Sequence, residues 1–167
     1  CANRTLYTKR PVRGGGAAED MAEDQALATL RLPGGALGTL EATKIASGAG
    51  DELILEIRGR AGAVRWNLAR PGILEYFDNT RPEAALGGTR GWTQIECDSR
   101  YPAPGGAFLP PRSAIGWERG HLHSYYSFLD CAVHGKEPSP SWEDALRTQE
   151  LMDACMRSAA QGRWVEL

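Results

Sequence analysis

The segment WERGHLH holds the densest group of side chains that could carry chemistry, with Glu118, His121 and His123 close together. Carboxylates and imidazoles are common metal ligands, and a histidine can also bind a substrate hydroxyl or carry a proton near neutral pH. Residues i and i+2 of a helix point about 200° apart, so the two histidines share one site only in an extended segment. No further Asp, Cys or His stands at ligand spacing, and we therefore predict no metal site. The two histidines then either cap the helix and pack on a sheet, or face a substrate.

Lys44 is the second candidate, because it ends the segment LGTLEATK and precedes the loop IASGAGD. Most lysines at strand ends are solvated charges, but this position could also lie at the mouth of a pocket beside a long loop. The sequence contains no GxSxG turn, P-loop or GxGxxG motif in a strand–helix context. Judged from these residues alone, the chain is a non-catalytic domain.

Composition limits the possible partners and compartment. The 167 residues are 42% hydrophobic and 24% charged, with a net charge of −2, so we expect one domain without affinity for nucleic acid or anionic membranes. No apolar run approaches the roughly 20 residues that span a bilayer. The four cysteines lie far apart without any CxxC pair, which favours a reduced, cytoplasmic protein over a disulfide framework.

The first two-thirds of the chain show strand-like alternation between turns such as PGGA and GRAG. Residues 14–20, GGGAAED, are expected to form a loop, and residues 98–119 are rich in Pro and Gly without periodicity. The expected strands cover residues 4–12, 26–32, 37–43, 53–58, 64–68, 73–78 and 92–97.

The last third is expected to form two helices and a closing strand. Apolar residues at helical spacing predict a helix over residues 121–134 that Gly135 ends. A second helix over residues 142–161 has Ser141 as N-cap, Asp144 at the reciprocal position and Gly162 as its stop. Strands first and helices afterwards predict an α+β fold: a largely antiparallel, open-faced sheet of about six strands with two C-terminal helices packed on one face, in a single domain over residues 1–167.

This ordered pattern resembles the C-terminal domain of the Gfo/Idh/MocA oxidoreductases, which include glucose–fructose oxidoreductase and inositol dehydrogenases. The resemblance covers residues 20–167 and begins with DQALATLRLPGGALGTLEATKIASG. An I-x-G-x-x-G hairpin follows at Ile57, Gly59 and Gly62. The family's closing pattern matches at Phe128, Ala132, Val133, Gly135, Pro138, Asp144, Ala145, Leu146, Ser158, Ala159 and Gly162.

The resemblance implies a longer parent protein, an NAD(P)-dependent oxidoreductase that acts on a CH–OH group of a sugar or polyol. Its cofactor, NAD or NADP, would be held by an N-terminal Rossmann domain with an EKP-type lysine. A helix bearing Asp and His would open the second domain. None of these features is present in this sequence, so this chain by itself is expected to bind no dinucleotide and to have no catalytic residue.

The same resemblance implies that this domain forms one wall of the substrate pocket and, through its open sheet face, a homo-oligomer. The residues expected to bind substrate hydroxyls are Lys44, Trp117, Glu118, His121 and His123.

Two alternatives remain. One is a stand-alone ligand-binding or assembly domain. The other is a surface lipoprotein acylated on Cys1, against which ANRTLYTKRPV lacks a flexible polar tether. We expect instead that the chain is part of a longer protein. The sequence upstream of Cys1 distinguishes these three hypotheses. A Rossmann segment with an EKP motif indicates the oxidoreductase, a lipobox indicates the lipoprotein, and neither signal indicates the stand-alone domain.

Overall fold

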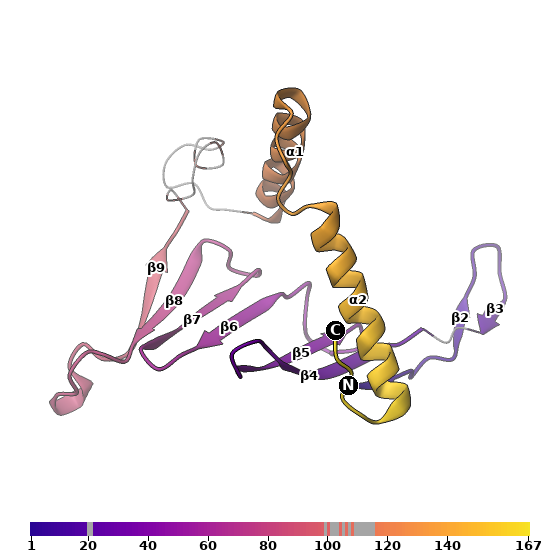
Figure 1. Ribbon diagram of the computed structural model, residues 1–167, viewed down its shortest axis with the longest axis horizontal. Coiled ribbons are helices and arrows are strands. Elements are labelled where there is room, and N and C mark those ends of the chain that lie inside the picture. Colours follow the sequence, from indigo (N-terminus) through magenta and orange to yellow (C-terminus); the bar gives the residue numbers. More distant parts are fainter. Residues whose placement is uncertain (20–21, 99, 101–103, 105, 107, 109–115) are drawn as a thin grey trace. The chain divides into compact units, whose positions relative to one another are not determined.

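The computed structural model describes residues 1–19, 22–98, 100, 104, 106, 108 and 116–167 (Figure 1). These residues form two compact units, one made of Cys1–Gly48 and Ser139–Leu167 and the other of Ala49–Pro138. Antiparallel strands come first and two helices follow, so the predicted α+β class is confirmed.

The first unit contains a three-stranded antiparallel sheet in the order β1 (Ala2–Arg4), β4 (Gln25–Arg31) and β5 (Leu37–Thr43). The turn PGGA joins β4 to β5, and the N–H of Leu32 closes it by donating to the carbonyl of Ala36 at 2.8 Å. Both strands and their turn agree with the sequence prediction to within one residue, because alternation and a tight glycine turn are local signals.

The predicted strand over residues 4–12 is wrong as one element. β1 ends at Arg4, and a separate strand, β2 (Lys9–Pro11), pairs with β3 (Ala17–Glu19). The chain is interrupted because the N–H groups of Leu6 and Tyr7 donate to a side-chain oxygen of Asp24 at 2.7 and 2.9 Å. β3 lies within the expected loop over residues 14–20, whose first residues, GGG, make the hairpin turn; residue 20 falls outside the described residues.

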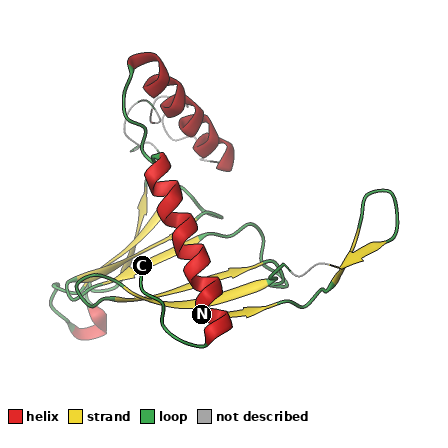
Figure 2. Cartoon of the chain, turned by 45° about the vertical axis from the view of Figure 1, so that its right-hand side comes forward, coloured by secondary structure: helices red, strands yellow, loops and turns green. Residues whose placement is uncertain are grey.

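The helix α2 (Trp142–Gln161) belongs to the first unit and begins as predicted with a reciprocal capping box between Ser141 and Asp144. Its C-terminal end lies against β1 (Figure 2). The amino group of Cys1 donates to Ser158 Oγ at 2.9 Å, and the Asn3 amide reaches Met156 Sδ at 3.0 Å.

The expected closing strand does not form. Residues 163–167 are irregular, because the chain turns back after α2 and the Ser158 hydroxyl donates to the carbonyl of Arg163 at 2.8 Å. Trp164 then lies under the guanidinium of Arg31, 5.0 Å from the ring centre.

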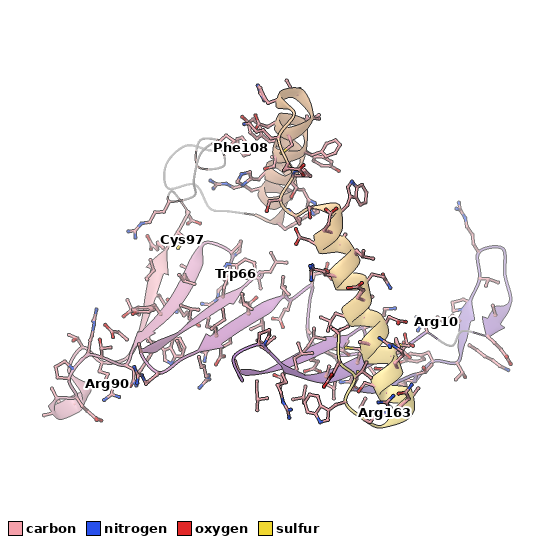
Figure 3. The ribbon with its side chains drawn as sticks, in the orientation of Figure 1. Arg10, Trp66, Arg90, Cys97, Phe108 and Arg163 are labelled. Atoms are coloured by element: carbon pink, nitrogen blue, oxygen red, sulfur yellow. The ribbon has the colours of Figure 1, made fainter. Side chains whose placement is uncertain are left out.

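The second unit contains a four-stranded antiparallel meander. Its strands are β6 (Ile54–Arg58), β7 (Gly62–Asn67), β8 (Ile73–Asp78) and β9 (Trp92–Glu96), with a short helical turn, η1 (Ala85–Gly87), before β9. One face carries the cross-strand row Glu56, Arg65, Glu75 and Gln94, and the other carries Leu55, Trp66, Leu74 and Ile95. This alternation confirms the strands expected over these residues. The Trp66 indole also donates to the carbonyl of Pro71 at 3.1 Å (Figure 3).

The helix α1 (Trp117–His134) also belongs to the second unit. It ends at Gly135 as predicted, but it begins about one turn earlier than the predicted start at His121. The prediction relied on an apolar stripe that starts at Leu122, whereas Glu118 stabilises the first turn by its charge near the positive end of the helix dipole. Neither helix of the described residues is long and apolar enough to cross a membrane.

Candidate functional site

Lys44 lies in the first unit, one residue after β5. Its N–H donates to the carbonyl of Asp24 at 2.8 Å, which continues the sheet beyond the β4–β5 pairing. The N–H of the next residue, Ile45, donates to Thr43 Oγ1 at 3.2 Å, so the turn after the strand is held locally. The Lys44 side chain is exposed and available to a ligand.

The other four predicted residues all lie on α1, in the second unit. The His121 ring meets Trp117 edge-on with 5.1 Å between ring centres, and the His123 ring meets Phe108 edge-on at 5.9 Å. Figure 3 shows Phe108 beside the helix. The two histidines therefore have different aromatic partners, as their i, i+2 spacing on a helix requires.

The start of α1 brings an exposed aromatic ring together with exposed polar groups. Trp117 is 63% exposed, and Glu118 and His121 are exposed beside it. An aromatic ring binds the apolar C–H face of a ring sugar, while carboxylate and imidazole groups bind its hydroxyls. Among the residues that the structure describes, no group of three or more His, Cys, Asp or Glu could hold a metal ion.

The structure thus brings Trp117 and His121 into contact and places His123 in a separate aromatic contact. Lys44 belongs to the other unit. The role of all five residues in substrate binding stays a prediction.

Sequence reasoning missed Asp24, which is only 2% exposed. Its Oδ2 accepts the N–H groups of Leu6 and Tyr7, and its Oδ1 accepts a hydrogen bond from Arg10 at 2.5 Å. The N–H groups of Tyr7 and Leu6, and then the charge of Arg10, lower the pKa of this carboxyl below its ordinary value. The only sequence signal for a role of Asp24 is its place directly before an alternating strand. That position does not predict that its hydrogen-bond partners come from residues 14 to 18 positions earlier.

Arg119 was also missed, although it stands between two predicted site residues. It is 7% exposed, and its guanidinium donates to the carbonyl of Asp98 at 3.1 Å. The Cys97 N–H donates to the carbonyl of Gly72 at 2.7 Å. These bonds tie the first turn of α1 to the end of β9 and to the start of β8. Because arginines are rarely buried, sequence alone favours an exposed position for Arg119.

The described residues do not fit a dinucleotide. Dinucleotides bind at a glycine-rich turn that joins a strand of a parallel sheet to a helix N-terminus. Every strand pairing described here is antiparallel, and α2 follows the connector KEPSPS. We therefore assign no cofactor contact to these residues.

Comparison with known proteins finds oxidoreductases that resemble this chain in sequence and in fold. Levoglucosan dehydrogenase from Pseudarthrobacter phenanthrenivorans is 26% identical over 146 residues, which cover 87% of this chain and 36% of that protein. The crystal structure of an oxidoreductase domain protein from Kribbella flavida has a TM-score of 0.86 at 27% identity over 99% of this chain and 42% of the other. A levoglucosan dehydrogenase in complex with NADH and levoglucosan has a TM-score of 0.86 at 25% identity, over 99% of this chain and 43% of the other.

The chain thus spans between 36% and 43% of the length of these relatives. A sequence profile described as the C-terminal alpha/beta domain of an oxidoreductase family matches residues 2–167. Since the match extends over nearly every residue and the fold agrees, the chain belongs to the Gfo/Idh/MocA oxidoreductase family, of which it carries the C-terminal domain.

Proposed function

We propose that this chain is the substrate-binding and oligomerisation domain of an NAD(P)-dependent dehydrogenase that acts on a CH–OH group of a sugar or polyol. The observation that carries the proposal is the fold shared at a TM-score of 0.86 with a levoglucosan dehydrogenase in complex with NADH and levoglucosan. The sugar-dehydrogenase relative at 26% identity supports the same substrate class.

In this proposal Lys44, Trp117, Glu118, His121 and His123 bind substrate and none of them is the catalytic base. The exposed Lys44 ammonium donates to a hydroxyl, and the exposed ring of Trp117 takes the apolar face of the sugar. His123 is half-buried against Phe108, which limits the orientations of its imidazole and suits directional binding. The residues that move the proton and the hydride belong to the rest of the protein.

The proposed partners are an N-terminal Rossmann domain in the same protein, which holds NAD or NADP, and further copies of this chain. The antiparallel strands described here do not offer a nucleotide site, which supports a separate cofactor domain. All four cysteines are free thiols, and this supports a reducing, cytoplasmic location. Neither a nucleic acid nor a membrane is part of the proposal.

The test uses the full-length protein and a panel of sugars and polyols that includes levoglucosan. Reduced nicotinamide is followed by its absorbance, with NAD and NADP in parallel. We expect one class of substrates to be oxidised, and Lys44→Met to raise KM for it about tenfold because a charge-assisted hydrogen bond is lost. Lys9→Met removes another exposed lysine of the same unit and is the matched control. Absence of turnover with every sugar and polyol contradicts the proposal.

A further inference from the structure

Asp24 occupies the end of the β1–β4–β5 sheet where two segments of the chain leave it. Its N–H donates to the carbonyl of Arg4 at 2.9 Å, and its carbonyl accepts the N–H of Lys44 at 2.8 Å. The peptide groups of this one residue therefore hold the chain after β1 on one side and the chain after β5 on the other. Lys44, the proposed sugar-binding cation, is the residue so held.

The side chain of Asp24 holds the same residue in place through a second set of hydrogen bonds. It binds the N–H groups of Leu6 and Tyr7 and the guanidinium of Arg10, so both carboxylate oxygens have partners. Arg10 lies at the start of the β2–β3 hairpin (Figure 3). A buried carboxylate is stable only with such partners, and together they leave it one orientation. We expect loss of these bonds to displace the Asp24 main chain, whose carbonyl accepts the N–H of Lys44.

We propose that Asp24 is a positioning residue for sugar binding, which fixes the main chain at Lys44 and so sets the reach of the Lys44 ammonium. The inference rests on the proposed function, in which Lys44 binds a substrate hydroxyl. Asp24 itself is only 2% exposed, too little for direct contact with a substrate. Its effect is on the placement of one donor, and misplacing a binding group by about 1 Å can cost up to about 100-fold in activity.

Kinetics of the full-length protein test the inference through a double-mutant cycle. Asp24→Asn keeps the size of the side chain but removes its charge and turns one acceptor into a donor. We expect this variant to raise KM about tenfold with little change in kcat. In the Lys44→Met background the same change is expected to have no further effect on KM. Asp153→Asn, an exposed carboxylate on α2 of the same unit, is the matched control.

An equal rise of KM in both backgrounds shows that Asp24 acts on the fold in general and overturns the inference. If Lys44→Met alone leaves KM unchanged, the proposed role of Lys44 fails, and the inference fails with it for that separate reason. Arg10→Gln provides a milder variant, because it removes one of the three partners and leaves the carboxylate in place. We expect a smaller rise of KM that again disappears without Lys44.

Amide hydrogen exchange measured by NMR gives a readout that needs no activity. The N–H groups of Leu6, Tyr7 and Lys44 are expected to exchange slowly in the wild type and much faster in Asp24→Asn. Amides of β7 in the other unit are expected to keep their rates. Unchanged protection of Lys44 in the variant overturns the inference even if no sugar is turned over.

Discussion

At the scale of single residues, two buried polar side chains, Asp24 and Arg119, connect segments that are distant in the sequence. Asp24 binds three groups contributed by residues 14 to 18 positions earlier in the chain. Arg119 reaches Asp98 across 21 positions. Both side chains are buried, so the cost of leaving either one unpaired favours a single local arrangement.

Asp24 should also make the stability of the protein depend on acidity. Its pKa in the folded state is lowered, first by the N–H groups of Tyr7 and Leu6 and then by Arg10, whereas in the unfolded chain it is ordinary. Because the pKa is lower in the folded state, the ionised carboxylate stabilises the protein at pH values above its unfolded pKa of about 4. This stabilisation is lost as the pH falls through the pKa of the folded state.

We therefore expect the free energy of unfolding of the wild type to fall more steeply below about pH 4 than that of Asp24→Asn. Urea denaturation of both proteins between about pH 3 and pH 7 measures this difference. The control Asp153→Asn should follow the wild type. If the free energy of unfolding depends on pH equally in wild type and Asp24→Asn, protonation of Asp24 is not coupled to folding, and the prediction is wrong.

At the scale of elements, each helix ends at a glycine. Gly135 and Gly162 have φ values of 60° and 62°, in the left-handed region that favours glycine over other residues. Gly162 donates its N–H to the carbonyl of Ser158 at 2.9 Å, which satisfies one of the last carbonyls of α2. Local sequence is sufficient for such ends, and both were predicted.

The same substitution should have opposite effects at two glycines. Gly162→Ala is expected to lower the free energy of unfolding by about 1–2 kcal/mol, because a Cβ in the left-handed region meets the following carbonyl. Gly120→Ala, inside α1, should raise it by about 0.5–1 kcal/mol, because alanine favours the helix and, among the described residues, no atom outside the neighbouring helix backbone lies within 4 Å of the new Cβ. Urea denaturation measures both free energies of unfolding. A lower free energy of unfolding in Gly120→Ala would contradict the free space at the Gly120 Cβ position.

At the scale of the whole molecule, the two faces of the β6–β9 sheet differ in chemistry. One face is apolar. On the opposite face the Arg65 guanidinium lies 3.0 Å from the Glu56 carboxylate and 3.5 Å from the Glu75 carboxylate. The charges of these three side chains therefore compensate one another within the sheet. The same guanidinium lies over the ring of Trp92 at 4.3 Å. Arginine and tryptophan are enriched in protein interfaces, and we expect this face to be the proposed contact between copies of the chain.

Ile54 is 57% exposed at one edge of that face, where Asn67 is its neighbour on β7. We expect Ile54→Asp to lower the mass of the full-length protein in solution, because it buries an unpaired charge in the contact. Size-exclusion chromatography with light scattering measures the mass. Leu86→Asp, at an exposed position in η1 of the same unit, is the matched control and should leave the mass unchanged. A monomeric wild type, or an unchanged mass for Ile54→Asp, would contradict the proposed oligomer.

The sequence by itself determined the elements whose signals are local. Alternation between glycine turns identified β4 to β9, and the Ser141 cap with its glycine stop identified α2. The family and its expected substrate class also came from the sequence, because the motifs lie in a fixed order along the chain. The candidate residues on α1 were chosen in the same way, from residue types within one short segment.

Only the tertiary structure decided where the first predicted strand breaks, where α1 begins and which polar groups are buried. Leu6 and Tyr7 leave the strand because Asp24 accepts their N–H groups, and Arg119 is buried because its guanidinium reaches Asp98. The sequence contains no pattern for these contacts, since each joins residues that come together only when the chain folds. The physical reason is the cost of burying an unpaired polar group, which is set by the partners that the fold supplies.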